Sequence, residues 1–440
     1  SFSADTGSSS TDFITKTAAQ TISGTLSANV ASGEVVYVSL DNGSTWSTAT
    51  TSVGANTWSL SGQTLAGSNT LKVKVTDAAG NDGTVSSQAY VLDTTAPTTT
   101  VATQSFSADT GTSSTDFVTK TASQTVSGTV SANMVAGEIV EVSLDNGSTW
   151  TTATTTVGSN TWTLSGVTLL GSNTLKVRVS DSAGNSGTVY NQAYVLDQLA
   201  PTVSNVTSST ANGTYKVGDT ISVQVNFTEA VTITGTPQLT LETGTTDRVI
   251  SYAGGSGTST LTFTYTVQSG DTTSDLDYIS TSALTLNGGT IMDAAGNNAT
   301  LTLATTGATN SLGDNKNIVI DGNVPTTTSV SVPSNSTYGA SANLDFTINF
   351  SENVTVNTSG GTPRIALTIG STTRYATYVS GSGTSALLFR YTTVTGDNDS
   401  DGIAVAGTMD ANGGTLQDAA GNDATLTLNS VGSTAAVLVS

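Results

Sequence analysis

The chain repeats one short loop motif at domain-sized intervals, and this repetition constrains the fold more than any other feature. The pentapeptide Asp-Ala-Ala-Gly-Asn, once with Ser for the first Ala, begins at Asp77, Asp181, Asp293 and Asp418. The intervals of 104, 112 and 125 residues each match one small domain. Such spacing predicts a tandem array instead of one large fold. The length of 440 residues gives the same expectation of three or four domains.

Longer repeats show that the array contains two kinds of domain. Residues 1–97 and 105–201 are near-copies, in which SFSADTGSSSTDFITKTA recurs as SFSADTGTSSTDFVTKTA and SLDNGSTW occurs twice. Residues 235–266 and 361–392 form a second, related pair. A Pro-Thr pair follows each predicted linker, and proline cannot continue a strand ladder. We therefore predict four domains, at residues 1–96, 97–200, 201–323 and 324–440.

The apolar residues alternate with polar ones in short runs, which predicts half-buried β-strands. Clear examples are Ile221, Val223, Val225 and Phe227, and later Leu344, Phe346, Ile348 and Phe350. No segment has a helical period. Roughly seven such strands in about 100 residues are typical of an immunoglobulin-like two-sheet sandwich. The predicted fold class is all-β, with four tandem sandwiches in an elongated rod on the order of 150 Å long.

Charge and composition exclude several functions. With 32 acidic and 12 basic residues the net charge is −20, which argues against a nucleic-acid partner. No apolar run approaches the roughly 18 residues that span a membrane, so we predict no membrane insertion in this segment. The sequence has no Cys and no His, which excludes disulfides, thiolate zinc sites and histidine catalysis. We predict that the chain is not an enzyme. It begins at Ser1 without Met and stops in mid-pattern at Ser440, so we expect a piece of a longer chain.

The repeated SLDNGSTW segment resembles the Asp-box of sialidases. In that family the box is a hairpin feature remote from the catalytic centre. Here Asn42-Gly43 and Asn146-Gly147 supply the positive φ angles that a tight hairpin needs. A sialidase would also need an arginine cluster, and residues 1–96 contain no Arg. We therefore interpret the motif as structural.

The recurring loops predict metal sites at the domain junctions. In a seven-strand sandwich, the loop before the last strand lies at the end where the chain enters, beside the linker from the preceding domain. Two acidic elements would meet there and repel, and a divalent cation reverses that repulsion. Carboxylate and amide oxygens suit calcium. The predicted partners are Asp181 and Asn185 with Asp93, Asp293 and Asn297 with Asp197, and Asp418 and Asn422 with Asp321, while Asp77 and Asn81 have no such linker acid.

Further acids are predicted at the same end of each domain. They are Asp5, Asp12, Asp109 and Asp116 in the first pair, and Glu229, Asp271, Asp275, Glu352, Asp397, Asp399 and Asp401 in the second. Residues 397–402 read D-x-D-x-D-G, the start of a calcium loop, but without the Glu six positions beyond the Gly. Asp418, Asn422 or Glu352 could complete that shell. The alternative is that Asp, Asn and Gly simply form turns. Four copies with matching acids favour calcium, Ca²⁺.

Together these motifs resemble bacterial Ig-like domains from giant calcium-binding surface adhesins of the RTX and biofilm-associated type. Asp277 of the DLDY motif departs from the pattern in the fourth domain, where Ile403 takes its place. The resemblance implies a secreted, bacterial cell-surface location and an extender role, in which calcium at the linkers stiffens a rod. The implied partners are neighbouring Ig-like repeats of the same chain, with host, abiotic or self surfaces left open. Two alternatives stay open: a self-assembling surface-layer, sheath or fibre protein, and a glycan-binding module.

Overall fold

The computed structural model describes residues 1–440 and divides into two compact units. The first contains residues 1–199 with 294–297, and the second contains residues 200–293 with 298–440. Each unit holds two separate hydrophobic cores, so four cores are distributed along the chain. Apart from one four-residue helix, α1 (Leu312–Asn315), the regular elements are strands. None of the chain's helical structure has the length and apolarity needed to cross a membrane.

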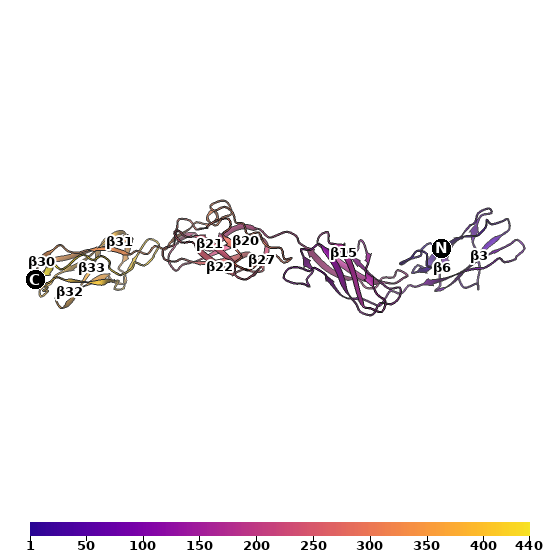
Figure 1. Ribbon diagram of the computed structural model, residues 1–440, viewed down its shortest axis with the longest axis horizontal. Helices are drawn as coiled ribbons and strands as arrows, with labels where there is room; N and C mark the ends of the chain where they lie inside the picture. Colours follow the sequence, from indigo (N-terminus) through magenta and orange to yellow (C-terminus); the bar gives the residue numbers. More distant parts are fainter. The chain divides into compact units, whose positions relative to one another are not determined.

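The core of residues 1–96 lies between two sheets (Figure 1). Phe2, Ile22, Val36 and Trp58 are among its buried side chains. The larger sheet has the order β1 (Ile14–Thr15), β8 (Ser86–Leu92), β7 (Asn69–Thr76), β3 (Val35–Ser39), β4 (Ser47–Thr48). The smaller sheet consists of β2 (Ala19–Thr25), β6 (Thr57–Thr64) and β5 (Thr50–Thr51).

Residues 97–200 repeat this arrangement and add one strand to the smaller sheet. The larger sheet has the order β10 (Val118–Thr119), β17 (Tyr190–Leu196), β16 (Asn173–Ser180), β12 (Ile139–Ser143), β13 (Thr151–Thr152). The smaller has the order β14 (Thr154–Thr155), β15 (Thr161–Thr168), β11 (Ser123–Val130), β9 (Val101–Phe106). In residues 1–96 an isolated bridge between Phe2 and Ile22 takes the place of the β9 pairing.

The second unit contains the sister type of sandwich. In residues 201–323 the long strand β20 (Thr220–Thr234) lies between β18 (Val203–Ser208) and β23 (Thr258–Thr266). The sheet continues through β22 (Arg248–Gly254), β21 (Gln238–Glu242) and β25 (Asp277–Tyr278), while β26 (Leu284–Thr285) pairs with β21 and β27 (Thr290–Met292) with β20. A small sheet has the order β19 (Gly213–Tyr215), β28 (Ile318–Asp321), β24 (Thr272–Thr273).

Residues 324–440 follow the same plan. Here β31 (Asn343–Asn357) lies between β29 (Thr327–Ser331) and β34 (Thr384–Thr392). The sheet continues through β33 (Thr372–Ser380), β32 (Arg364–Ile369) and β35 (Ala404–Asp410), with β36 (Thr415–Gln417) paired to β31. A two-stranded sheet joins β30 (Ser336–Tyr338) to β37 (Val437–Val439).

The predicted alternation of buried and solvent-facing residues is confirmed in the long strands. Along β20 every second residue from Ile221 to Phe227 is buried, and β31 shows the same pattern from Leu344 to Phe350. Burying one face of each sheet removes apolar surface from water and holds the sheets together without disulfides. The predicted all-β sandwich architecture is thus confirmed.

The two Asp-box segments lie in hairpin loops, but the loops are longer than the tight turn that the sequence predicts, since β3 ends at Ser39 and β4 begins at Ser47. Asn42 and Gly43 have φ angles of 60° and 93°. The Asp41 carboxylate accepts hydrogen bonds from the Thr45 hydroxyl, the Thr45 amide and the Ser39 hydroxyl, and these bonds lower its pKa to about 2. Every hydrogen bond of this carboxylate thus serves to close the turn.

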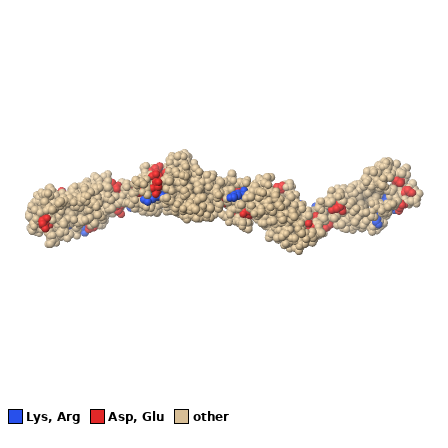
Figure 2. All heavy atoms as spheres, in the orientation of Figure 1, with Lys and Arg blue, Asp and Glu red and all other residues tan.

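Charged residues are sparse on the surface. On the face shown in Figure 2, Lys and Arg atoms form small separate patches and do not merge into a continuous basic surface. This distribution agrees with the net charge of −20.

Candidate metal centre

Each recurring loop is closed by its own Asp and Asn. In the second copy, the Asp181 amide donates to the Asn185 carbonyl at 3.0 Å, and the Asp181 carboxylate accepts from the Ala183 amide, the Asn185 amide and the Asn185 side chain. Gly184 has a φ of 87°, which suits glycine. Asp181, Gly184 and Asn185 therefore form a turn, and this turn leaves lone pairs on the second carboxylate oxygen for another partner.

The loops also meet the preceding linkers, as the strand count predicts. The Asn185 side-chain amide donates to the Asp93 carbonyl at 2.8 Å, and Asn422 does the same to Asp321 at 2.8 Å. Asn297, which belongs to the first unit, donates to the Asp197 carbonyl at 2.9 Å. These contacts use the main-chain carbonyl of the linker residue. Asp77 and Asn81 are exposed.

One set of predicted ligands forms a compact three-carboxylate cluster in the second unit. One oxygen each from Asp321, Glu352 and Asp418 lies within 4.8 Å of the other two. Asp321 ends β28, Glu352 lies in the irregular part of β31, and Asp418 opens the recurring loop. Asp418 is only 6% exposed. Three segments far apart in the sequence thus bring their charges to one point.

The charges within this cluster affect the pKa of Glu352. Burial raises the pKa of Glu352, and the charges of Asp418 and Asp321 raise it further. Asn422 is 3% exposed and supports the cluster from behind: its side-chain amide donates to Asp418, and its side-chain oxygen accepts from the Val217 amide at 2.9 Å. Asn422 is thus placed as a scaffold of the cluster. Asp197, Glu229 and Asp293 occupy the corresponding positions in the sequence.

The acids of the DTG…TDF segments are arranged differently. Asp5 and Asp109 each accept the amide of the Phe eight residues later through one oxygen, while the other oxygen is buried without a hydrogen-bond partner. Burial, and to a lesser extent the charge of Asp116, raises the pKa of Asp109. Asp12 and Asp116 are exposed and accept the amide two residues further on. None of these four acids belongs to a three-carboxylate cluster.

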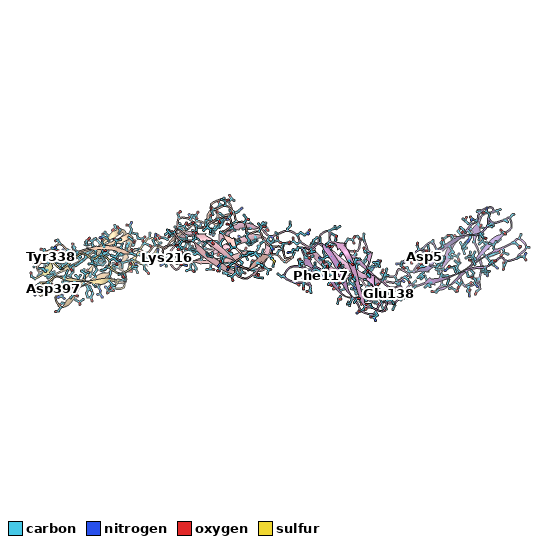
Figure 3. The ribbon with its side chains drawn as sticks, in the orientation of Figure 1. Asp5, Phe117, Glu138, Lys216, Tyr338 and Asp397 are labelled. Carbon is cyan, nitrogen blue, oxygen red and sulfur yellow. The ribbon has the colours of Figure 1, made fainter.

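The predicted position of the 397–401 loop is wrong. β34 pairs antiparallel with β31, so that Thr392 lies opposite Asn343, the first residue of β31. The loop after β34 therefore lies at the opposite end of the domain from Glu352. Asp399 forms a bridge with Val439 near the C-terminus, and Figure 3 shows Asp397 with Tyr338 at that end. Asp397, Asp399 and Asp401 cannot share one site with Glu352 and Asp418.

The same antiparallel pairing corrects the position of Asp271 and Asp275. Thr266, which ends β23, lies opposite Thr220, which begins β20, so the loop that follows is remote from Glu229. Instead Asp271 lies beside Asp321, since its carbonyl accepts the Gly322 amide at 2.7 Å. Asp275 is exposed as a whole residue, but partial desolvation of its carboxyl and the charge of Asp277 raise its pKa.

Asp271 and Asp397 have a different task from the predicted one. The Asp271 carboxylate pairs with Arg248 at 2.6 Å and accepts the Tyr265 hydroxyl at 2.7 Å. Asp397 repeats this with Arg374 at 2.7 Å and the Tyr391 hydroxyl at 2.5 Å. Asp399 in turn accepts the amides of Gly370 and Gly402. The sequence offered one signal for this arrangement, because Arg and Tyr recur at matched positions in the two copies.

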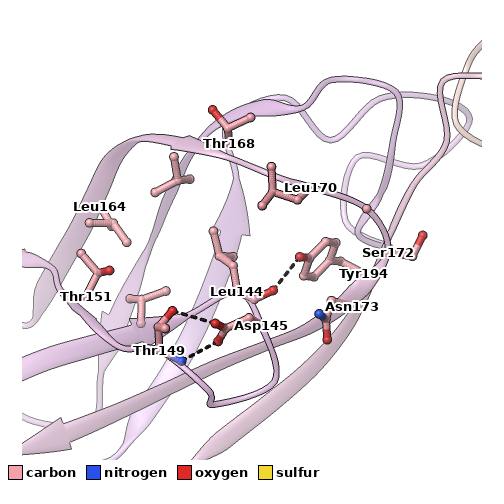
Figure 4. A pocket seen from close by; sticks show the side chains of 13 residues that line it. Leu144, Asp145, Thr149, Thr151, Leu164, Thr168, Leu170, Ser172, Asn173 and Tyr194 are labelled. Atoms are coloured by element: carbon pink, nitrogen blue, oxygen red, sulfur yellow. Dashed lines mark hydrogen bonds between the residues drawn. The ribbon is translucent and has the colours of Figure 1, made fainter.

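A pocket of about 360 Å³ lies beside the Asp-box hairpin of residues 97–200, between Leu144, Leu164, Leu170 and Tyr194 (Figure 4). An equivalent pocket of about 320 Å³ occurs in residues 1–96. The polar groups are used internally: Asp145 accepts bonds from Thr149, and the Tyr194 hydroxyl donates to the Leu144 carbonyl at 2.7 Å. We therefore assign no ligand to this pocket.

The junction in the first unit depends on a close backbone approach at Gly7. Gly7 has a φ of 99°, and a Cβ built there would lie 1.9 Å from the Ser182 carbonyl oxygen in the recurring loop. We expect Gly7→Ala to open this contact at a cost of roughly 1–3 kcal/mol. Faster amide hydrogen exchange in residues 181–187 would report the opening.

Gly54→Ala is the matched control for this prediction. Gly54 has a φ of 85°, but a Cβ there would have no heavy atom within 4 Å. The Gly54→Ala variant therefore has the strain of a positive φ angle but no clash with a neighbouring backbone. Equal exchange in residues 181–187 for the two variants would contradict the role of Gly7.

Comparison with known proteins identifies the first two domains. Residues 1–94 and 95–198 each match the family model described as a bacterial Ig-like domain. No curated protein matches the chain.

Among solved structures, a titin I-band fragment I67–I69 is 11% identical, with 75% of this chain and 99% of that chain covered and a TM-score of 0.26. A plexin A4 extracellular region is 8% identical, with coverage of 94% and 47% and a TM-score of 0.25. A Bacteroides ovatus protein, SGBP-B of a mixed-linkage glucan utilization locus, is 12% identical, with coverage of 87% of both chains and a TM-score of 0.15. At these scores the likenesses carry no functional argument. Residues 1–198 are thus two bacterial Ig-like domains, within a chain whose fold is all-β and Ig-like.

Proposed function

We propose that this chain is an extender region of a secreted bacterial surface adhesin, and that calcium bound at its domain junctions stiffens it. The observation that carries the proposal is the cluster of Asp321, Glu352 and Asp418, whose oxygens lie within 4.8 Å of one another. The match of residues 1–198 to bacterial Ig-like domains supports the extracellular setting.

The dimensions of the cluster suit calcium. Oxygen ligands lie about 2.4 Å from a calcium ion, so two ligands of one ion are at most about 4.8 Å apart. Carboxylate oxygens are also the hard ligands that calcium prefers. A bound ion would offset the repulsion that raises the pKa of Glu352. The three carboxylates fit the ion in both spacing and charge.

Binding at this cluster would act on the linker. Asp321 ends the strand before the linker, whereas Glu352 and Asp418 belong to the next sandwich. An ion that contacts all three side chains therefore ties the linker to the following core. Extracellular calcium-binding modules typically have a Kd of about 10⁻⁴–10⁻³ M. We expect a Kd in this range for the cluster, which suits a structural ion outside the cell.

The proposed role is structural and not enzymatic. The Asp-box carboxylates close their hairpins, and Asp271 and Asp397 are held by arginine and tyrosine. The partners of this region would be its neighbouring repeats, while a host, abiotic or self surface would be bound by another part of the parent protein.

Small-angle scattering of the whole chain tests the proposal. With calcium we expect a long, well-defined maximum dimension. After EDTA we expect a broader distribution of dimensions and a lower melting temperature, because the linker is released. An unchanged maximum dimension and melting temperature in EDTA would falsify calcium-dependent stiffening, and magnesium at equal ionic strength controls for screening of the net charge.

A further inference from the structure

Three lysines occupy equivalent places at the recurring loops. In the first unit the Lys16 ammonium donates to the Gly184 carbonyl at 2.5 Å, and the Lys120 ammonium donates to the Gly296 carbonyl at 2.5 Å. In the second unit the Lys216 ammonium donates to the Gly421 carbonyl at 2.9 Å. Each acceptor is the glycine carbonyl of a recurring loop. The lysine precedes that glycine by 168, 176 and 205 residues, respectively.

The two kinds of domain supply this lysine from different sequence segments. Lys16 and Lys120 follow the TDF(I/V)T motif, while Lys216 follows the Thr-Tyr pair of β19. Neighbouring contacts differ as well. Thr6 donates its hydroxyl to the Ala183 carbonyl at 2.7 Å in the first unit, whereas the Val217 amide donates to the Asn422 side chain in the second. Both kinds share the ammonium-to-glycine contact, as they share the contact of the loop Asn with the linker carbonyl.

The loop is suited to receive a cation. Its glycine has a positive φ, 87° at Gly184 and 93° at Gly421, and its carbonyl is used by no backbone hydrogen bond within the turn. A hydrogen bond from an ammonium group to a carbonyl is charge-assisted and stronger than a neutral one. We propose that this lysine is a latch that, within each unit, docks one domain onto the recurring loop of the next one, without any metal ion. The partner that this surface fits is a following domain with an Asp-x-Ala-Gly-Asn loop.

The sandwich fold does not require the latch lysine, which acts only at the junction between domains. In residues 324–440 the position of Lys216 is taken by Gly339, although the preceding Tyr338 donates to the Ser334 carbonyl as Tyr215 does to the Ala211 carbonyl. The fourth sandwich therefore forms its fold without the lysine. The end of that domain that carries Gly339 presents no latch ammonium.

Distance measurements between two spin labels test the latch in the full chain with EDTA present throughout. The chain has no Cys, so Val249→Cys and Val379→Cys place one label on each sandwich of the second unit, at side chains that are 57% and 47% exposed. With Lys216 we expect one dominant distance. With Lys216→Met the fraction outside that peak should rise at least roughly tenfold, as loss of a hydrogen bond to a charged group implies.

Lys316→Met is the matched control. The Lys316 ammonium also donates to a backbone carbonyl, that of Thr210 at 3.1 Å, but both residues lie in the same sandwich, residues 201–323. The control should keep the parent distribution. Lys16→Met with labels at Val53→Cys and Val157→Cys repeats the test in the first unit, at side chains that are 69% and 66% exposed.

The outcomes separate the latch from the calcium proposal. A parent-like distribution in both Lys216→Met and Lys16→Met, or equal broadening in Lys316→Met, overturns the latch. Because these measurements are made in EDTA, they stand whether or not calcium binds. Conversely, if calcium has no effect on the scattering or melting temperature of the parent chain but Lys216→Met still broadens the distances, the latch stands and the calcium proposal is wrong.

Discussion

Glu352→Gln should change the stability of residues 324–440 in opposite directions with and without calcium. Without calcium we expect slower hydrogen exchange in β31 and β34, because the variant removes one of three clustered charges. Burial, Asp418 and Asp321 all raise the pKa of Glu352, which means that its charged form is disfavoured in the folded chain. A neutral glutamine side chain avoids that unfavourable charge.

With calcium the effect of Glu352→Gln should reverse. At a free concentration one hundred times Kd, a bound ion stabilises the folded state by about 2.7 kcal/mol. The variant lacks one of the three carboxylate ligands and should lose most of this gain. The measurement is hydrogen exchange by mass spectrometry on the peptides that contain β31 and β34, across a calcium titration.

Asp423→Asn provides the matched control. Asp423 is exposed, directly follows the recurring loop and lies outside the three-carboxylate cluster. Asp423→Asn, like Glu352→Gln, replaces one carboxylate by a neutral amide close to the site. A calcium response that is the same in Glu352→Gln and in the parent chain would rule out this cluster as the calcium site.

The sequence predicted the parts of the site that depend on counting strands between repeats. It placed the recurring loops beside the linkers, and Asn185 and Asn422 do contact the carbonyls of Asp93 and Asp321. It also identified Glu352 as a candidate ligand. These inferences hold because the loop before the last strand of a sandwich has only one end at which it can lie.

The position of Asp397 could not be predicted from the sequence, because the composition of a loop does not show at which end of the sandwich the loop lies. A run that reads D-x-D-x-D-G suggests a calcium loop in any context, but β34 runs antiparallel to β31 and carries Asp397 to the far end. The lysine contacts were missed for a related reason. Lys16 and Lys216 have no local partner in the sequence, and their acceptors are carbonyls of glycines in the next sandwich. A backbone acceptor leaves no signature in residue type.

The largest loss of stability should follow removal of Asp271. Its side chain is 1% exposed, and its oxygens bind Arg248, Tyr265 and the Gln268 amide. Asp271→Ala leaves a guanidinium and a buried hydroxyl without their acceptor, which should destabilise residues 201–323 by about 3 kcal/mol. The exposed pair of Arg364 and Asp410 is the control, since Asp410→Ala removes a carboxylate whose pair is open to water and should have a small effect.

The same carboxylate predicts the acid limit of this domain. Burial acts to raise the pKa of Asp271, but the hydrogen bonds from Arg248, Tyr265 and the Gln268 amide outweigh it and lower the pKa below its usual value. A group with a lowered folded pKa contributes stability that is present above its unfolded value, about 3.9, and is lost as the pH falls through the folded pKa. Hydrogen exchange in β20 and β23 should therefore accelerate in the parent chain below about pH 3.9, relative to its rate at neutral pH after correction for intrinsic exchange. Asp271→Ala should lack this component, because it has no carboxylate to protonate, and an identical acid response in the two chains would show that another group sets the limit.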